Sequence, residues 1–140
     1  MKASIIYWSS TGNTETMANA IADAAKAAGA DITLAAVSEA SADDVLASDI
    51  IVLGCPAMGS EELDDSEMEP FFSSIEGRLA GKKVALFGSY DWGDGEWMRI
   101  WYDRAKAAGA DMIQSEGLIA HLDPDSDALA QCSELGKKLA

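Results

Sequence analysis

Nearly unbroken apolar segments alternate along this chain with segments whose apolar residues recur every three or four positions. The first pattern predicts strands buried in a sheet, and the second predicts amphipathic helices that cover the sheet. The predicted strands span residues 3–8, 31–37, 49–54, 82–89 and 111–119, and the polar residues 115–117 can interrupt the last of them. The predicted helices span residues 17–28, 42–47, 70–79, 97–108 and 129–139. This alternation predicts a doubly wound α/β fold with a parallel sheet and helices on both faces.

One domain accounts for the whole chain, residues 1–140. At this length a folded chain buries roughly two thirds of the surface that it exposes when unfolded, which allows a substantial core. In a doubly wound sheet, ligands bind beyond the carboxyl ends of the strands, where the strand order reverses. This rule selects three loops as the candidate binding region: 9–14, 55–69 and 89–96.

The net charge of the chain indicates which classes of partner it can bind. It has 24 acidic and 10 basic residues, which leaves a formal net charge of −14 at pH 7. Such a charge argues against binding to nucleic acid or to an anionic membrane, because phosphate contacts need Lys and Arg. It favours basic protein partners, whose approach the negative field would speed. Solubility alone is an equally open explanation of the charge.

The cysteines and the apolar segments bear on location. Cys55 and Cys132 have neither the spacing of a disulfide framework nor that of a metal site. No apolar run approaches the roughly 20 residues of a membrane-spanning helix, and the start of the chain lacks the pattern of a signal peptide. We therefore expect the protein to work in the reducing cytoplasm. We also expect it to be a monomer.

The first selected loop is rich in hydroxyl groups and lacks basic residues. Its members are Ser9, Ser10, Thr11, Gly12, Asn13 and Thr14. Backbone N–H groups and the positive end of the dipole at a helix start suit a phosphate group. The loop has neither the Lys of a Walker loop nor the glycine spacing of a dinucleotide loop, so it fits a permanently bound phosphate monoester better than a transferred one. An ordinary cluster of helix-capping residues is the open alternative.

The same residues resemble the FMN phosphate loop of flavodoxins, in particular the short-chain, clostridial type. The first strand and loop read IIYWSSTGNT, the third strand leads into GCPAMGSEE, the fourth reads LFGSYDWG, and GEWM follows. Three matches, each at a predicted strand end, make the resemblance specific, and together they cover nearly the whole chain. It implies a flavodoxin-like three-layer sandwich whose five-stranded parallel sheet has the order 2-1-3-4-5, with one non-covalently bound FMN.

The resemblance also implies a role for each loop residue. Met58 would lie on one face of the isoalloxazine and Trp92 on the other. Gly59 would turn its peptide so that its carbonyl accepts a hydrogen bond from the reduced flavin N5–H, which needs backbone freedom that only glycine has. Glu61 would bond the N3 edge. The phosphate would be held by Ser9, Thr11, Gly12, Asn13 and Thr14, with Ser10 in the same loop. The remaining expected contacts are Pro56, Ala57, Ser60, Ser89, Tyr90, Asp91 and Gly93.

Two positions depart from the family pattern. Asp91 stands where the family usually has Gly, and its carboxylate would either disfavour an anionic reduced flavin or face solvent. Pro56 stands where some relatives have a Ser that reaches the phosphate. Elsewhere, Trp97 and Trp101 fit the buried face of their helix. The single histidine, His121, is a poor candidate for a metal ligand; we expect a surface role, with backbone near it close to the flavin rim.

The second loop contains a run of acidic residues. They are Glu61, Glu62, Asp64, Asp65, Glu67 and Glu69. Acids before Pro70 can simply favour the first turn of the next helix. Because they continue directly from a flavin loop, we favour instead an acidic docking rim around an exposed flavin edge.

The function implied is that of a low-potential one-electron carrier rather than an enzyme. It would shuttle FMN between semiquinone and hydroquinone and substitute for ferredoxin between basic-surfaced redox enzymes. The alternative is an FMN-dependent NAD(P)H or quinone reductase, which would need a nicotinamide site, and neither a basic pocket nor an extra loop is visible for one. A phosphoacceptor domain of similar topology needs an Asp after the third strand, where this chain has Gly54 and Cys55.

Overall fold

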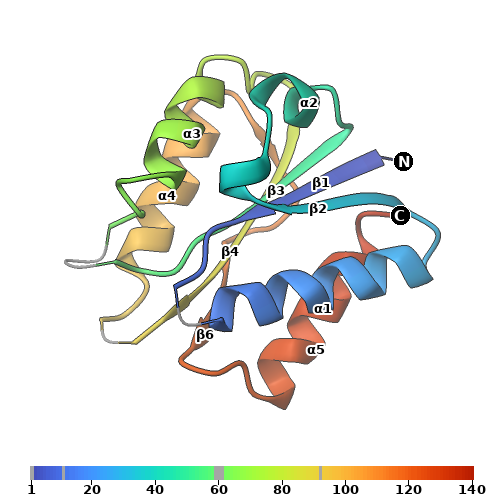
Figure 1. Ribbon diagram of the computed structural model, residues 1–140, viewed down its shortest axis with the longest axis vertical. Coiled ribbons are helices and arrows are strands. Elements are labelled where there is room, and N and C mark those ends of the chain that lie inside the picture. The colour runs from blue at the N-terminus through green and yellow to red at the C-terminus, as the bar shows by residue number, and fades with distance from the viewer. Residues whose placement is uncertain (1, 11, 59–61, 92) are drawn as a thin grey trace.

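A computed structural model describes residues 2–10, 12–58, 62–91 and 93–140 (Figure 1). Its strands are β1 (Lys2–Tyr7), β2 (Asp31–Ala36), β3 (Ile50–Gly54), β4 (Lys83–Tyr90), β5 (Asp111–Met112) and β6 (Leu118–His121). Its helices are α1 (Asn13–Ala27), α2 (Ala42–Leu46), α3 (Met68–Glu76), α4 (Glu96–Ala107) and α5 (Ser126–Lys137), with a short 3₁₀ turn η1 (Val37–Glu39). Each predicted element is present, and α3 begins two residues before the predicted start.

All strand pairs are parallel, and the strand order is β2-β1-β3-β4-β5, with β6 also paired to β4. The predicted order and the helices on both faces are thereby confirmed. The strand β3 is buried along its whole length. A central strand covered on both faces has no solvent side, which is why its sequence IIVLG shows no polar alternation.

The predicted last strand is split into β5 and β6, and the polar residues that could interrupt it lie between the two. The two-residue β5 pairs with the start of β4, and β6 pairs with the end of β4 from Phe87 to Tyr90. Between them the side chain of Gln114 accepts a hydrogen bond from the N–H of Leu86 at 2.9 Å. This side chain thus satisfies a ladder group that the interrupted strand leaves open.

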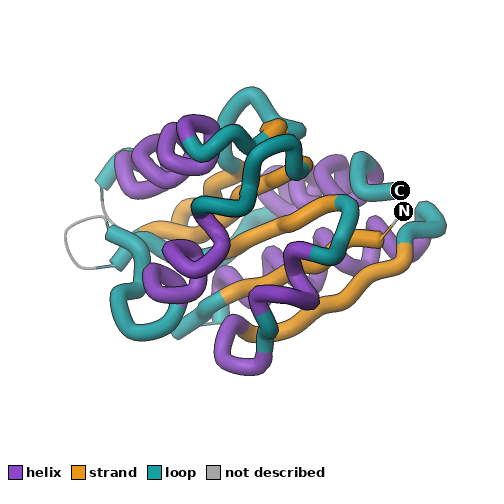
Figure 2. Tube along the Cα trace, turned by 90° about the horizontal axis from the view of Figure 1, so that it is seen from above, coloured by secondary structure: helices purple, strands orange, loops and turns teal. Residues whose placement is uncertain are grey.

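Helices lie on both sides of the sheet (Figure 2), and two apolar clusters hold these layers together. On one face of the sheet, α1 and α5 pack over the inward side chains of β1, β3 and β4. On the other face, α2, α3 and α4 cover the sheet, with Trp97 and Trp101 almost fully buried as predicted. The first and last helices lie side by side (Figure 1), and they approach so closely that a Cβ at Gly136 would come within 2.4 Å of the Ile21 carbonyl oxygen.

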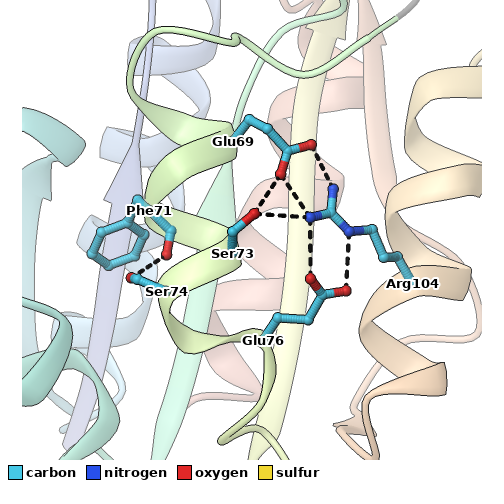
Figure 3. Close-up of polar contacts among 6 residues, drawn as sticks. All are labelled: Glu69, Phe71, Ser73, Ser74, Glu76 and Arg104. Atoms are coloured by element: carbon cyan, nitrogen blue, oxygen red, sulfur yellow. Dashed lines mark hydrogen bonds and ion pairs between the residues drawn. The ribbon is translucent and has the colours of Figure 1, made fainter.

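Arg104 joins α4 to α3 through a hydrogen-bonded network (Figure 3). Its guanidinium donates to both carboxylate oxygens of Glu69, at 2.7 and 2.6 Å, and to both of Glu76, at 3.0 and 3.1 Å. It also lies 4.9 Å from the centre of the Phe72 ring. Hydrogen bonds from Arg104 lower the pKa of Glu69, against the opposing effect of burial. Bonded to two carboxylates of α3, this arginine fixes how the two helices pack.

Candidate functional site

The three loops selected from the sequence meet at one end of the sheet, because β1, β3 and β4 are neighbours there. Backbone hydrogen bonds continue past the strand ends and join the loops. The N–H of Trp8 donates to the Gly54 carbonyl at 2.9 Å, and the N–H of Ala57 donates to the Ser89 carbonyl at 3.0 Å. The indole N–H of Trp97 donates to the Cys55 carbonyl at 3.1 Å. The loops therefore form one connected surface.

The first loop turns sharply into α1. Gly12 adopts a left-handed conformation, with φ of 94°, that non-glycine residues rarely take, and α1 begins at Asn13. The Ser9 hydroxyl accepts a hydrogen bond from the Gly12 N–H at 3.1 Å. Ser10 is exposed, while Ser9 and Asn13 are half-buried. The Glu15 N–H also donates to the Ser9 hydroxyl, at 3.4 Å. The start of α1 therefore lies beside a loop that carries hydroxyl groups, an arrangement that can accept an anion.

The first and third loops are joined by a buried pair of hydroxyls. Thr14 and Ser89 are 1% and 3% exposed, and their side-chain oxygens lie 2.8 Å apart. Each hydroxyl satisfies the other away from water, so the pair fixes the start of α1 against the end of β4.

Replacing Thr14 with Val is expected to lower the free energy of unfolding by about 1–3 kcal/mol, because the Ser89 hydroxyl would be left buried without its partner. The double variant Thr14→Val/Ser89→Ala should lose less than the sum of the two single losses, since it leaves no orphaned hydroxyl. Urea unfolding of the four proteins measures the coupling. Simple additivity would mean that the hydroxyl pair contributes nothing of its own.

In the second loop, Pro56 is buried and Ala57 and Met58 are half-buried. The backbones of Met58 and Glu62 exchange two hydrogen bonds, of 2.8 and 2.9 Å. In the third loop, Ser89 is buried, Tyr90 is half-buried, and Asp91 and Gly93 are exposed. The exposure of Asp91 is compatible with the solvent-facing alternative for its carboxylate.

Five of the predicted site residues lie outside the described residues: Thr11, Gly59, Ser60, Glu61 and Trp92. The other predicted contacts fall on the three joined loops.

The acidic run of the second loop is only partly a surface rim: Asp64 is buried, which corrects the prediction at that residue, and Glu67 and Glu69 are half-buried. Asp64 is 4% exposed, and its carboxylate accepts hydrogen bonds from the N–H groups of Glu67 and Met68, at 2.7 and 3.0 Å. Glu67 accepts a hydrogen bond from the indole N–H of Trp8 at 3.1 Å, and Glu69 binds Arg104. Glu62 and Asp65 are the described members that remain exposed.

Asp64 serves as the cap of the turn that leads into α3. Burial alone would raise the pKa of its carboxyl, but hydrogen bonds from Met68, Ser66 and Glu67 outweigh that effect and hold the pKa below its ordinary value. The spacing Asp64-x-x-Glu67 before an apolar helix is a capping signal that could have identified this role from the sequence.

Both cysteines are buried, as their apolar surroundings predict. Burial raises the pKa of the Cys55 thiol to about 12 and that of Cys132 to about 11. Both thiols therefore stay protonated at neutral pH and act as small apolar side chains. The Cys55 sulfur also accepts a hydrogen bond from the Asp64 N–H at 3.4 Å, which links the second loop to the cap of α3.

A cavity of about 810 Å³ lies apart from the three joined loops, between α4, α5 and residues 114–119 at the sheet edge. Of the described residues of the third loop, Asp94 and Gly95 line it. Among the described residues, no group of three or more His, Cys, Asp or Glu side chains could hold a metal ion. None of the helices in the described ranges has the length and apolar character needed to cross a membrane.

Comparison with known proteins agrees with this geometry. The family model described as flavodoxin matches residues 5–136. Flavodoxin from Megasphaera elsdenii is 52% identical over 136 residues, which cover 97% of this chain and 96% of that protein. Flavodoxin from Clostridium beijerinckii is 48% identical, with coverage of 97% and 97%. The solution structure of two-electron reduced Megasphaera elsdenii flavodoxin has a TM-score of 0.87 at 51% identity, and covers 98% of this chain and 97% of that one. The chain therefore belongs to the flavodoxin family, whose members bind FMN and act as electron carriers rather than enzymes.

Proposed function

We propose that this protein is a low-potential one-electron carrier that holds FMN in the three joined loops and alternates between the semiquinone and hydroquinone forms. The observation that supports this proposal best is the buried link between Thr14 and Ser89, which brings the phosphate end and the ring end of the expected site together.

The phosphate would lie at the start of α1, held by residues 9–14. A Cβ added at Gly12 would meet none of the described atoms within 4 Å, so space is open beside the helix start. The site offers N–H and hydroxyl donors there and no basic side chain. Such donors neutralise a phosphate through dipoles, which suits a cofactor that stays bound.

The isoalloxazine would lie between the second and third loops. Met58, which is half-buried, would support one face. The family resemblance gives the other face to Trp92, the N3 edge to Glu61 and the turning peptide to Gly59. Pro56, Ala57, Ser60, Ser89, Tyr90, Asp91 and Gly93 would complete the surroundings. The flavin supplies the redox chemistry, while these groups bind it, orient it and limit the access of water.

The proposal also includes the partner proteins and the location in the cell. A net charge of −14 would attract basic-surfaced oxidoreductases that also use ferredoxin, and would disfavour additional negative charge on the cofactor. The exposed Glu62 and Asp65 lie on the segment next to the expected flavin edge. We further propose that residues 1–140 form one domain that acts as a monomer in the cytoplasm.

An anaerobic reductive titration of the FMN-loaded protein, followed by its visible spectrum, tests the proposal. We expect a blue neutral semiquinone to accumulate and then to bleach, which indicates two separated one-electron steps. Direct passage from oxidised to fully reduced flavin would favour an FMN-dependent NAD(P)H or quinone reductase instead. Failure to bind FMN would refute both functions.

A further inference from the structure

The segment after β6 touches the loop that follows β4. Strand β6 pairs with the end of β4 so that His121 lies opposite Tyr90. The Leu122 N–H donates to the Tyr90 carbonyl at 2.7 Å, and His121 Nε2 lies 2.8 Å from the carbonyl oxygen of Asp91. A carbonyl oxygen only accepts hydrogen bonds, so Nε2 carries the proton and donates it. Two successive carbonyls of the third loop are thus bound by two successive residues.

Leu122 has a conformation that leucine by itself would avoid. Its φ is 57°, in the left-handed region, and it is the single non-glycine residue with a positive φ among the described residues. A side chain with a Cβ is disfavoured there. Its side chain gains little from burial, because it is 44% exposed. Leu122 also donates the hydrogen bond to the Tyr90 carbonyl, so the chain takes this strained conformation directly after its contact with the third loop.

The ring of Tyr90, in the third loop, also has two aromatic neighbours. The Tyr90 ring lies 5.0 Å from the His121 ring and 5.7 Å from the Trp97 ring, measured between centres. Trp97 is anchored to the second loop through the Cys55 carbonyl. Tyr90 is therefore held between a buried residue of α4 and an exposed residue at the end of β6.

We propose that His121 is a positioning residue for the flavin: through the Asp91 carbonyl, and together with Leu122, it fixes the third loop in its binding conformation before FMN arrives. A loop ordered in advance loses less conformational freedom on binding, so the cofactor binds more tightly. His121 acts through the backbone of the loop and contacts no reacting atom. This inference rests on the proposed function, since it assumes that the third loop receives the flavin.

The test compares three variants with the parent protein. His121→Ala removes both the donor and the ring, while His121→Gln keeps an N–H donor of similar reach. Lys82→Ala is the matched control, because it removes a 2.7 Å bond from a side chain to a backbone carbonyl, that of Leu46, at the opposite end of β4. FMN affinity is measured on each apoprotein by quenching of flavin fluorescence, and amide hydrogen exchange is measured on the same apoproteins.

For His121→Ala we expect the Kd for FMN to rise about 3- to 10-fold, because this is the change in affinity that the loss of one hydrogen bond produces. We also expect hydrogen exchange at the Leu122 N–H to become faster. His121→Gln and Lys82→Ala should stay within about twofold of the parent Kd. Parent affinity in His121→Ala, or an equal loss in His121→Gln, would overturn the assignment. If the parent itself does not bind FMN, the proposed function fails; unchanged exchange at Leu122 in His121→Ala would then show separately that His121 does not order the loop.

Discussion

Replacing Gly88 with Ala is expected to lower the free energy of unfolding by about 3 kcal/mol, because the new methyl group has no space. A Cβ at this position would lie 2.2 Å from the Cys55 carbonyl oxygen and 3.1 Å from the Trp97 ring. Neither neighbour can move cheaply, since that carbonyl accepts the Trp97 hydrogen bond. Relief of the clash would have to part β4 from the start of the second loop, and so would also weaken FMN binding.

Gly77→Ala is the control for this experiment. Gly77 ends α3 with a φ of −73°, and an added Cβ would meet none of the described atoms within 4 Å. Alanine there should be neutral or stabilise the protein by up to about 1 kcal/mol, because it restricts the unfolded chain. Urea unfolding of the apoproteins, followed by circular dichroism, measures both changes. Parent stability in Gly88→Ala would show that β4 and the start of the second loop are not in contact at this point.

The second large effect is expected at Asp64. Replacing it with Asn keeps the shape but removes the charge that the N–H groups of Glu67 and Met68 stabilise, and should cost about 1.5–3 kcal/mol at pH 7. Because the pKa of Asp64 is lowered in the folded protein, its contribution is complete above the unfolded pKa of about 4 and is lost as the pH falls through the folded pKa. The difference between parent and variant should therefore shrink in acid.

Asp65→Asn provides the comparison, because Asp65 is the adjacent acid and is exposed. Its replacement should change the unfolding free energy by less than about 0.5 kcal/mol at pH 7. Urea midpoints measured from pH 7 to pH 3 for parent and both variants give the two pH profiles. An Asp64→Asn profile parallel to that of the parent would contradict the capping role.

The elements of this fold follow from short stretches of sequence. The unbroken apolar run of β3 and the helical spacing of Met17 and Ile21 in α1 depend only on which faces are covered. Gly12, which ends the turn before α1, and the polar residues between β5 and β6 are likewise signals that a short stretch of sequence carries. The site loops could be placed for the same reason, because the carboxyl ends of neighbouring parallel strands share one edge.

The contacts that depend on tertiary packing could not be predicted in this way. Arg104 meets Glu76 and Glu69 across 28 and 35 residues of sequence, so no spacing rule indicates them. His121 reaches Asp91 only because β6 resumes beside β4 after the interruption, and the length of that interruption decides the register. Asp64 is a different case: its signal is local, but the run of acids around it suggested a surface role.

The side-by-side packing of α1 and α5 has a consequence for how the protein is made. Met17 and Ile21 on α1 belong to the same apolar cluster as Cys132 and Leu135 on α5, although the two helices are the first and the last of the fold in sequence order. During translation the apolar stripe of α1 has no α5 to cover it until α5 itself has left the ribosome. Completion of this half of the core must therefore wait for the synthesis of α5, and the nascent chain presents a site for chaperones up to that moment.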